Sequence, residues 1–455
     1  MSSLASRVGP PALAFALVSG LACDRPARSP DAVPGGDSTA TATVGSAVDS
    51  VTVPEGFRFT IFADTIGPAR HIAVRPNGDV YVNTWRSPYD SARRVPQGGF
   101  LVALRDTNHD GSADRIQRFG AETGNGGTGI AIFRDAVYVE AGPAILRYRL
   151  EAGELVPGSP PDTIVSGLPV DGGHPMHPIT IDPEGNLFVN SGSATNSCQV
   201  KDRSPGPPGE RPCRELATRA GIWRFSATRT KQRFDSTGRH ATGIRNAGGL
   251  AINPADGALY ATQHGRDQLA ENWPKLYDWK ESAELPAEEL LLVVKGGDYG
   301  WPYCYHDPKK EKLVLAPEYG GDGEKVGECA GKLGPAAHFP AHWAPNALAF
   351  YGGDAFPEAY RGGAFIGFHG SWNRAPEPQQ GYNVVFQPFS GGKPSGDYQI
   401  FADGFAGPRK QPGSARHRPA GLAVGSDGAL YISDDAGGRV WRVVFGEDES
   451  SGGPS

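Results

Sequence analysis

The sequence predicts an all-β protein, a six-bladed β-propeller with long loops on one face. Three observations support this: a strand–turn–strand pattern recurs six times, turn-forming residues are abundant, and convincing amphipathic helices are scarce. The 455 residues include 63 Gly and 40 Pro, which suits a fold with many tight turns. The chain also has 20 Phe and 8 Trp, enough aromatic material for a core.

Each copy of the repeat has an apolar strand, a turn built from Pro, Asp, Asn or Gly, and a second strand in which residue types alternate. Several copies are followed by a further strand, as at 144–150, 221–227 and 439–445. Such a unit, repeated six times, is typical of propeller blades. A β-sandwich would not account for six similar units, and a solenoid would need shorter, more regular repeats. The copies occupy residues 71–83, 129–140, 178–190, 249–262, 347–367 and 421–434.

Two long stretches interrupt the repeat, residues 191–220 and 263–345. We expect both to be loops on one face, because loops on a rigid scaffold usually carry the binding residues. Within the second stretch, residues 288–295 (EELLLVVK) fit a short helix or a strand equally well.

The two ends of the chain differ in composition from the repeat region. Residues 1–22 combine one positive charge with a short apolar run, which predicts a signal peptide, and Cys23 follows in a lipoprotein-like context. An ordinary secretory peptide cut nearby is the alternative. We expect a flexible tether with a lipidated Cys23 over 23–51, the propeller over 52–445 and a disordered tail over 446–455. The protein would then be exported to the periplasm or cell envelope and lipid-anchored.

Charge and cysteine content narrow the class of partner. The net charge is −6, and the sequence has no block of basic residues, so no nucleic-acid partner is expected. A membrane contact is expected only through the lipid anchor. The four remaining cysteines form two sequence-local couples, and an exported protein can keep disulfides. A four-cysteine zinc site is the alternative, but no CxxC spacing occurs. We expect the disulfides Cys198–Cys213 and Cys304–Cys329.

A polar segment between two predicted strands has the spacing of a calcium loop. Oxygen-bearing side chains occupy its positions 1, 3, 5 and 9, and glycine stands at position 6, where such a loop turns sharply. It lacks the position-12 Glu of an EF-hand, and a polar turn without a metal is the alternative. The ligands of a structural Ca²⁺ here would be Asp106, Asn108, Asp110 and Asp114.

Residues 172–178 (GGHPMHP) precede the third hairpin and contain His174 and His177. Their prolines argue against a helix. An exposed loop histidine is a natural general base near neutral pH, whereas two imidazoles would need a third ligand to bind zinc. A hydrogen-bonded loop histidine is the alternative for each.

Three arginines lie beside corresponding edges of three hairpins: Arg245, Arg374 and Arg418. In a propeller such edges converge on the central axis. Three guanidinium groups would there suit a ligand with several carboxylates. Surface arginines are the alternative.

Four segments carry a family resemblance: GLAINPADGALYATQHG, VVKGGDYGWPYCY, FIGFHGSWNRAPEPQQGYNVVFQPF and RPAGLAVGSDGALYISDDAGGRVWRV. In this order they resemble the soluble aldose sugar dehydrogenases that depend on pyrroloquinoline quinone (PQQ), in particular the sorbosone dehydrogenase-like branch, over most of residues 55–445. The GWPYCY and HGSWNR motifs are specific, whereas the hairpins alone are common to many propellers. The resemblance implies PQQ and Ca²⁺ as cofactors, with the long loops on the cofactor face.

The resemblance also implies roles for single residues. His174 matches the general base that takes the proton of the anomeric hydroxyl as hydride passes to C5 of the quinone. The backbone of Gly265 and Arg266 matches the ligands of the PQQ-bound Ca²⁺, which polarises the quinone carbonyl. Gly248 and Arg266 depart from the family pattern of Gln and Pro. The implied cofactor-binding residues are Arg245, Asn246, Arg374 and Arg418, and we add His342 from the aromatic segment 341–351.

We therefore expect an enzyme, a quinoprotein sugar dehydrogenase that oxidises an aldose or a related sugar or aldehyde. No CxxCH haem motif occurs, so electrons would leave to an external acceptor. Two alternatives stay open. One is a non-catalytic surface propeller that binds a sugar or a protein. The other is a Ca²⁺-dependent lactonase or esterase, which would need carboxylate ligands at the axis.

Overall fold

The computed structural model describes residues 44–48, 50–85, 97–122 and 126–446. The chain divides into Met1–Thr41 and Ala42–Ser455, and every described residue belongs to the second unit. The predicted signal peptide, Cys23 and most of the predicted tether lie outside the described residues. No helix in the described part of the chain has the length and apolar character needed to cross a membrane.

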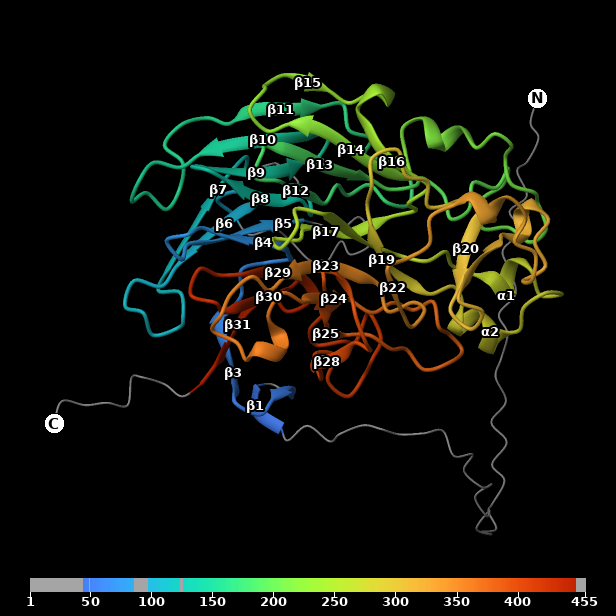
Figure 1. Cartoon of the computed structure of the whole chain (residues 1–455). Coiled ribbons are helices and arrows are strands. Elements are labelled where there is room, and N and C mark those ends of the chain that lie inside the picture. Colours follow the sequence, from blue (N-terminus) through green and yellow to red (C-terminus); the bar gives the residue numbers. More distant parts are fainter. Residues whose placement is uncertain (1–43, 49, 86–96, 123–125, 447–455) are drawn as a thin grey trace, which may run out of the picture. The chain divides into compact units, whose positions relative to one another are not determined.

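Within the described residues, six sheets follow one another along the chain, each with four antiparallel strands (Figure 1). Blade 1 consists of β4 (Ala69–Val74), β5 (Val80–Thr84), β6 (Leu101–Arg105) and β7 (Arg115–Phe119). Blade 2 consists of β8 (Ile130–Phe133), β9 (Ala136–Ala141), β10 (Ala144–Arg149) and β11 (Asp162–Ser166), and β15 (Gln232–Arg233) extends it by a parallel pairing. Blade 3 consists of β12 (Ile179–Ile181), β13 (Asn186–Ser191), β14 (Gly221–Ser226) and β16 (Arg239–Thr242).

The last three blades complete the propeller. Blade 4 consists of β17 (Ala247–Ile252), β18 (Leu259–Gln263), β19 (Glu288–Leu292) and β22 (Ala337–Phe339). Blade 5 consists of β23 (Pro345–Phe350), β24 (Ala364–Phe368), β25 (Asn383–Gln387) and β28 (Gln399–Ala402). Blade 6 consists of β29 (Pro419–Val424), β30 (Leu430–Asp434), β31 (Arg439–Phe445) and β3 (Phe57–Ala63).

The six blades close into a ring. Their first strands β4, β8, β12, β17, β23 and β29 pack against one another in this order, and β29 packs against β4. Hydrogen bonds also close the ring, because β3 from the beginning of the described chain pairs with β31 from its end. The predicted six-bladed propeller is confirmed, and the six predicted hairpins are the first two strands of the six blades.

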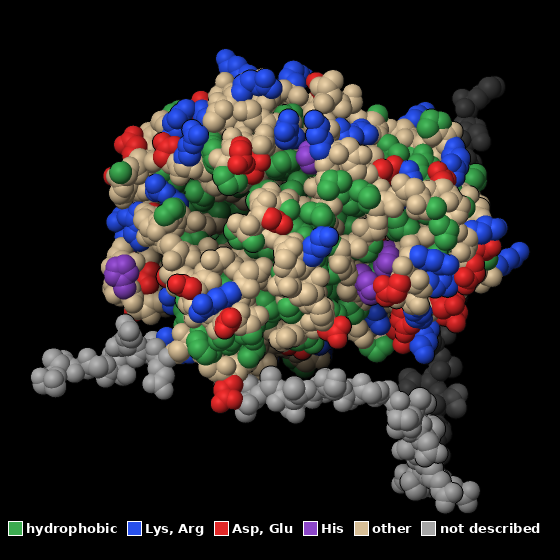
Figure 2. Space-filling view, in the orientation of Figure 1, with side chains coloured by type: hydrophobic (Ala, Val, Ile, Leu, Met, Phe, Trp, Pro, Cys, Tyr) green, Lys and Arg blue, Asp and Glu red, His purple; other side chains and the backbone are tan. Residues whose placement is uncertain are grey.

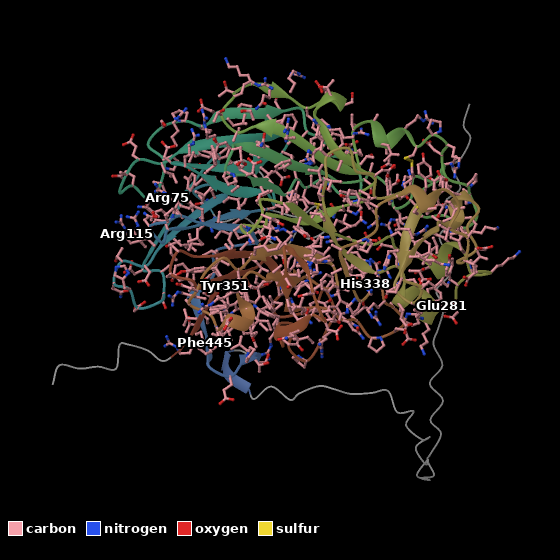
Figure 3. The ribbon with its side chains drawn as sticks, in the orientation of Figure 1. Arg75, Arg115, Glu281, His338, Tyr351 and Phe445 are labelled. Atoms are coloured by element: carbon pink, nitrogen blue, oxygen red, sulfur yellow. A yellow bond between two sulfur atoms is a disulfide. The ribbon has the colours of Figure 1, made fainter. Side chains whose placement is uncertain are left out.

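The core lies between neighbouring blades, where side chains fill the space between the sheets (Figure 3). In β31, Trp441 and Val443 belong to the apolar cluster shared with blade 5, whereas Val440 belongs to the cluster shared with blade 1. Successive side chains of a strand point to opposite faces, so one strand serves two interfaces. This explains why the blade strands are apolar along most of their length.

The sequence suggested that the stretch 263–345 is a loop, and this prediction is wrong. It contains β19 and β22 of blade 4, the helices α1 (Leu269–Asn272) and α2 (Trp279–Glu284), and a separate hairpin of β20 (Cys304–Asp307) and β21 (Lys312–Leu315). Residues 288–295 begin as strand β19, because Leu290 and Leu291 are fully buried between blades. The inserted hairpin hid the blade pattern in the sequence.

Smaller elements lie around the blades. β1 (Val44–Val48) and β2 (Val51–Pro54) form a two-stranded sheet, so the segment predicted as a tether includes β1. β26 (Phe389–Ser390) and β27 (Lys393–Pro394) form a short hairpin within blade 5. Short 3₁₀ helices span Arg214–Ala217, Ser236–Gly238, Pro317–Tyr319, Gly327–Gly331 and Glu358–Tyr360. On the face shown in Figure 2, basic and acidic side chains are interspersed, without a basic block.

Candidate functional site

A cavity of about 650 Å³ lies where the first strands of the blades begin and the second strands end. Residues from all six blades line it, which places it at the propeller axis. Thr128 and His174 precede the first strands of blades 2 and 3, and Asp267 and Asp435 follow the second strands of blades 4 and 6. We call it the axial cavity.

His174 lines the axial cavity and is held in one tautomer. Its Nδ1 lies 2.8 Å from the carbonyl oxygen of Ser193. A carbonyl can only accept, so Nδ1 carries the proton and Nε2 keeps its lone pair. Burial, with Arg245 nearby, lowers the pKa of His174 well below its usual range. The ring is therefore neutral at pH 7, the form that a general base requires.

Asp267 gathers the polar groups on one side of the cavity. Its carboxylate accepts hydrogen bonds from Arg245 and Arg203, each at 2.9 Å, and from Asn373 at 2.8 Å. Burial alone would raise the pKa of Asp267, but the two guanidinium groups hold it well below its ordinary value. Asp267 is thus ionised and orients Arg245.

Asp435 plays the same part on the opposite blades. Its carboxylate lies 2.7 Å from Nη1 of Arg70 and 2.9 Å from Nε2 of His369. Arg418 donates to the carbonyl oxygens of His369 and Gly370, at 3.0 and 2.5 Å. Burial lowers the pKa of His369 to about 3, so its Nε2–H is a neutral donor to the carboxylate.

The axial cavity carries an excess of positive charge. Four arginines line it, and two of its three carboxylates, Asp267 and Asp435, are ionised. Burial raises the pKa of the third, Glu288, to about 8. Its oxygens accept hydrogen bonds from the amides of Gly265 and Ala344. The lining arginines are Arg70, Arg203, Arg245 and Arg418.

The structure brings most of the predicted cofactor residues together. Arg245, Asn246, Arg418, His342 and the backbone of Gly265 all line the axial cavity with His174. The Nε2 atom of His342 lies 2.8 Å from the carbonyl oxygen of Ser282 and 3.1 Å from that of Leu285, which fixes the ring. The carbonyl oxygen of Gly265 accepts a hydrogen bond from Nη1 of Arg245 at 2.7 Å.

Arg374 and the side chain of Arg266 do not line the axial cavity. Arg374 instead donates to the backbone carbonyls of Pro378, Ala283 and Ala341, so its predicted place among three converging arginines is wrong. The Arg266 side chain, which stands where the family pattern has Pro, is buried in an ion pair with Glu318.

Two glycines are required by close packing at the cavity. A Cβ on Gly248 would lie 2.3 Å from the carbonyl oxygen of Pro345, because β17 and β23 approach closely there. This explains why no longer side chain stands at Gly248. A Cβ on Gly192 would lie 2.6 Å from Cβ of His174 and 2.8 Å from Oδ1 of Asn246. Gly192 therefore lets two predicted site residues come together.

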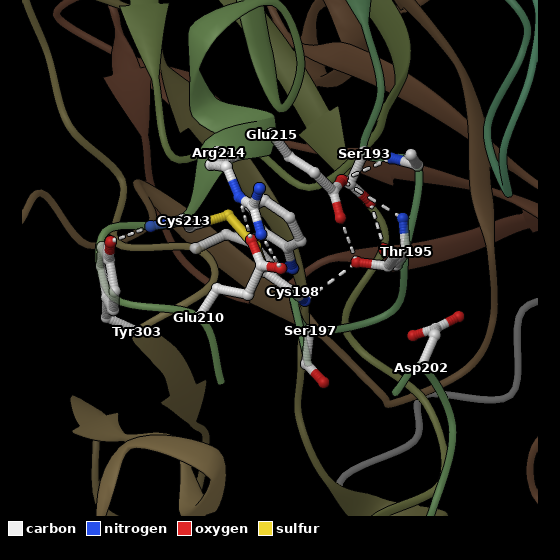
Figure 4. Close-up of a disulfide and its surroundings, with 12 residues drawn as sticks. Ser193, Thr195, Ser197, Cys198, Asp202, Glu210, Cys213, Arg214, Glu215 and Tyr303 are labelled. Carbon is white, nitrogen blue, oxygen red and sulfur yellow. Dashed lines mark hydrogen bonds and ion pairs between the residues drawn. A yellow bond between two sulfur atoms is a disulfide. The ribbon is translucent and has the colours of Figure 1, made fainter. Parts of the chain in front are cut away.

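A disulfide braces the loop that supports His174 (Figure 4). Cys198 and Cys213 are joined, with their Cα atoms 6.1 Å apart. Glu215 accepts hydrogen bonds from the amides of Ala194 and Thr195 at 2.7 and 3.2 Å. Ala194 and Thr195 directly follow Ser193, the hydrogen-bond partner of His174, so this loop segment is anchored to the 3₁₀ helix Arg214–Ala217.

The second disulfide joins Cys304 and Cys329, so both bridges are the pairs that the sequence predicts. Cys304 begins β20, and Cys329 lies in the 3₁₀ turn Gly327–Gly331. The bridge closes the inserted segment on itself and does not reach the axial cavity, which neither cysteine lines.

The predicted calcium loop connects β6 and β7 of blade 1. Asp106 accepts hydrogen bonds from the amides of Asp110 and Gly111, and Asp114 from the amide of Thr107. Within the described residues these carboxylates do not gather as a group of metal ligands. A structural Ca²⁺ here, held by Asp106, Asn108, Asp110 and Asp114, stays a prediction.

Sequence reasoning missed Arg70, Arg203, Asp267 and Asp435. Arg70 is the second residue of β4 in blade 1, close to the position from which Arg418, the residue before β29, was found in blade 6. Asp267 and Asp435 follow the second strands of their blades. Reading all six hairpins at these two positions would have found three of the four. Arg203 enters from the long loop 191–220, and nothing in the local sequence marks it.

Comparison with known proteins gives two kinds of match. The TrAA12-like family model matches residues 51–445. The aldose sugar dehydrogenase YliI of Escherichia coli K12 is 25% identical over 279 residues, 58% of this chain and 58% of that protein. An uncharacterized protein of Borreliella burgdorferi is 27% identical over 207 residues, 45% of this chain and 48% of that protein. The matches span about half the length of these curated relatives.

Solved structures show the same architecture. The AA12 protein of Trichoderma reesei, in a calcium structure, has a TM-score of 0.68 at 18% identity and covers 89% of this chain and 99% of its own. The holo form of the PQQ domain of pyranose dehydrogenase from Coprinopsis cinerea has a TM-score of 0.67 at 18% identity, covering 87% and 97%. At these identities the similarity shows a shared propeller fold.

Proposed function

The chain belongs to the TrAA12-like family, and from this premise we propose that it is a PQQ-dependent dehydrogenase that oxidises an aldose or a related sugar or aldehyde. One observation carries the proposal. The axial cavity combines a neutral histidine, fixed with a free lone pair, with four arginines. The Escherichia coli relative is named an aldose sugar dehydrogenase, which supports the same chemistry. Membership of the sorbosone dehydrogenase-like branch stays part of the proposal.

The residues of the cavity fit PQQ, a planar quinone with three carboxyl groups. The excess of positive charge favours a polyanion, and arginine forks match carboxylates. His264 also lines the cavity, and burial lowers the pKa of its ring to about 4, so the ring adds no charge at pH 7. Arg70, Arg245, Arg418 and Asn246 would hold the cofactor.

The cavity also offers oxygen ligands for Ca²⁺, which binds carboxylates and backbone carbonyls. The Gly265 carbonyl and the Asp267 carboxylate lie in its lining. When bound, PQQ and Ca²⁺ would supply a two-electron acceptor whose carbonyl is polarised by the metal. Nε2 of His174 would take the hydroxyl proton of the sugar, and the Ser193 carbonyl would stabilise the imidazolium that forms.

Trp372 supports a sugar as substrate. Its side chain is 61% exposed although it lines the axial cavity. A large aromatic ring with an apolar face suits the apolar face of a sugar ring. Because this ring lies exposed beside a cavity of about 650 Å³, we expect activity on several sugars.

A dye-linked assay of the purified protein tests the proposal. A panel of aldoses and aldehydes would be offered with PQQ plus Ca²⁺, with each alone, and with neither. We expect oxidation only when both are added. If no compound is oxidised although PQQ binds, only the proposed substrate class is wrong. If no compound is oxidised and PQQ does not bind, the proposal is overturned.

A non-catalytic propeller is the second candidate. The observation that favours it is the full engagement of Arg245, whose guanidinium already contacts Asn196, Gly265 and Asp267. A Ca²⁺-dependent lactonase is not favoured, since the described residues place no group of three metal-ligating side chains in the cavity. Export of the protein also stays a proposal, supported by its two disulfides.

A further inference from the structure

A second group of metal-ligating side chains lies away from the axial cavity, where the inserted hairpin β20–β21 meets the outer strand β22 of blade 4. His306 on β20, Glu311 in the hairpin turn and His338 on β22 each place a ligand atom within 4.8 Å of the other two. None of the three lines the axial cavity. Figure 3 labels His338, and in the same orientation Figure 2 shows histidine and acidic side chains together at this position on the surface.

The ring nitrogens of His306 are buried without hydrogen bonds to the described residues. Its side chain is buried, with 4% of the residue exposed, yet within the described residues neither Nδ1 nor Nε2 has a hydrogen-bond partner. Buried polar atoms are almost always paired, because an unpaired one costs about 1–3 kcal/mol. The imidazole rings of His306 and His338 have their centroids 5.1 Å apart. The unpaired ring thus faces the other two ligands.

The group is accessible to an ion. His306, Glu311 and His338 line one hollow of about 380 Å³ at the surface. The side chains of His338 and Glu311 are 32% and 68% exposed, and Nε2 of His338 lies 3.1 Å from Oε1 of Glu311. A metal entering the hollow would replace this contact and keep room for water as a further ligand.

We propose that His306, Glu311 and His338 bind one divalent transition-metal ion, with Zn²⁺ the best match. Two imidazoles and a carboxylate are a ligand set typical of zinc sites that leave a fourth position to water. Calcium and magnesium prefer oxygen ligands alone. The site is independent of the axial cavity and of its proposed cofactor.

The surroundings are compatible with a cation. Burial, with His338 as a lesser cause, lowers the pKa of His306 to about 4, so its ring is a neutral ligand at pH 7. Lys332 also lines the hollow, but it is paired with Asp298 at 2.5 Å. Lys312 lines the hollow as well. Its positive charge would repel the ion, and the negative charge of Glu311 offsets this repulsion.

A metal here would join two parts of the fold. Among the described strands, β20 and β21 pair with each other alone, in a two-stranded sheet, whereas β22 belongs to blade 4. The ion would cross-link the inserted hairpin to the blade, beside the Cys304–Cys329 bridge that closes the same insertion. Metal binding should therefore raise the stability of the folded chain.

Calorimetric titration of the metal-free full chain with ZnCl₂ tests the site. We compare the wild type with His338→Asn and Glu311→Gln, and use His109→Asn as the matched control because His109 is an exposed histidine outside the group. The His338→Asn variant should lose one Zn²⁺ equivalent or bind it at least tenfold more weakly, with a smaller effect in Glu311→Gln and none in the control. Equal stoichiometry and affinity in wild type and His338→Asn would overturn the proposal.

Cobalt serves as a second probe with a signal of its own. Co²⁺ bound to two imidazoles and a carboxylate gives visible d–d absorption, which His338→Asn should abolish and His109→Asn should retain. If His338→Asn fails to fold, Glu311→Gln decides the matter, because the Glu311 side chain is exposed and not needed for packing. A Co²⁺ spectrum unchanged in Glu311→Gln and no rise in melting temperature with Zn²⁺ would contradict the site.

Discussion

His174 shows at the scale of single residues how the backbone prepares a side chain for chemistry. The Ser193 carbonyl holds the proton on Nδ1, and Gly192 leaves the space that the ring occupies. The proline-rich segment 172–178 predicted a loop histidine, but it could not distinguish His174 from His177. In the structure His177 is fully buried between the carbonyls of Asn190 and Pro169, so only His174 can meet a substrate.

Substitution of His174 by alanine should lower kcat and leave PQQ affinity within a few fold. Loss of a general base typically reduces the rate by about 10²–10⁴-fold. Steady-state kinetics in the dye-linked assay, beside a PQQ titration, measure both quantities. Near-normal turnover of His174→Ala would refute the assignment.

The sequence predicts that Arg245 and Arg374 both bind PQQ, whereas the structure places only Arg245 of these two in the axial cavity. Arg245→Lys should weaken PQQ binding at least ~10-fold, because lysine cannot reproduce the bidentate fork. Arg374→Lys should leave PQQ affinity almost unchanged, since Arg374 faces backbone carbonyls outside the axial cavity. Equal losses in the two variants would show that Arg374 reaches the cofactor.

At the scale of elements, the sequence identified what is local. Each predicted hairpin is confirmed because its turn residues and its alternating strands lie next to each other in the chain. β3 and β22 were missed because their partners are remote: β3 pairs with β31, and β22 with β19 across the inserted hairpin. The sequence predicted only some of the residues of the axial cavity. The ends of the predicted strands indicate where such residues lie, but they do not indicate which side chains point into the cavity.

The closing strand β3 should contribute strongly to stability. Phe59 is 2% exposed and stacks on Trp441, with ring centroids 5.7 Å apart. Phe59→Ala should lower the free energy of unfolding by about 3–5 kcal/mol. Phe445→Ala on the neighbouring strand β31 is the control, because Phe445 is 43% exposed and should cost less. Denaturant unfolding of both variants measures the difference, and equal losses would contradict the closure described here.

At the scale of the whole molecule, buried histidines make stability depend on pH. Burial lowers the pKa of His71, His264 and His306 to about 4 and that of His369 to about 3. In the unfolded chain these groups take up a proton near pH 6.5, which favours unfolding. Their contribution is thus complete above about pH 6.5 and is lost as the pH falls toward about 4.

We therefore expect the free energy of unfolding to fall between about pH 7 and about pH 5 and to be nearly level above pH 7. Urea unfolding followed by fluorescence at several pH values measures this curve. A stability that stayed constant from about pH 7 to about pH 5 would mean that these rings are protonated in the folded protein.

Binding of PQQ to the purified chain in the presence of Ca²⁺ tests the proposed cofactor most directly. Trp372 and Trp85 line the axial cavity, so their fluorescence reports on its occupancy, and calorimetry gives the stoichiometry. We predict saturable quenching with one PQQ per chain, weakened in Arg245→Lys. No heat and no quenching with PQQ in excess would contradict the proposed cofactor, and the dehydrogenase assignment would then be wrong.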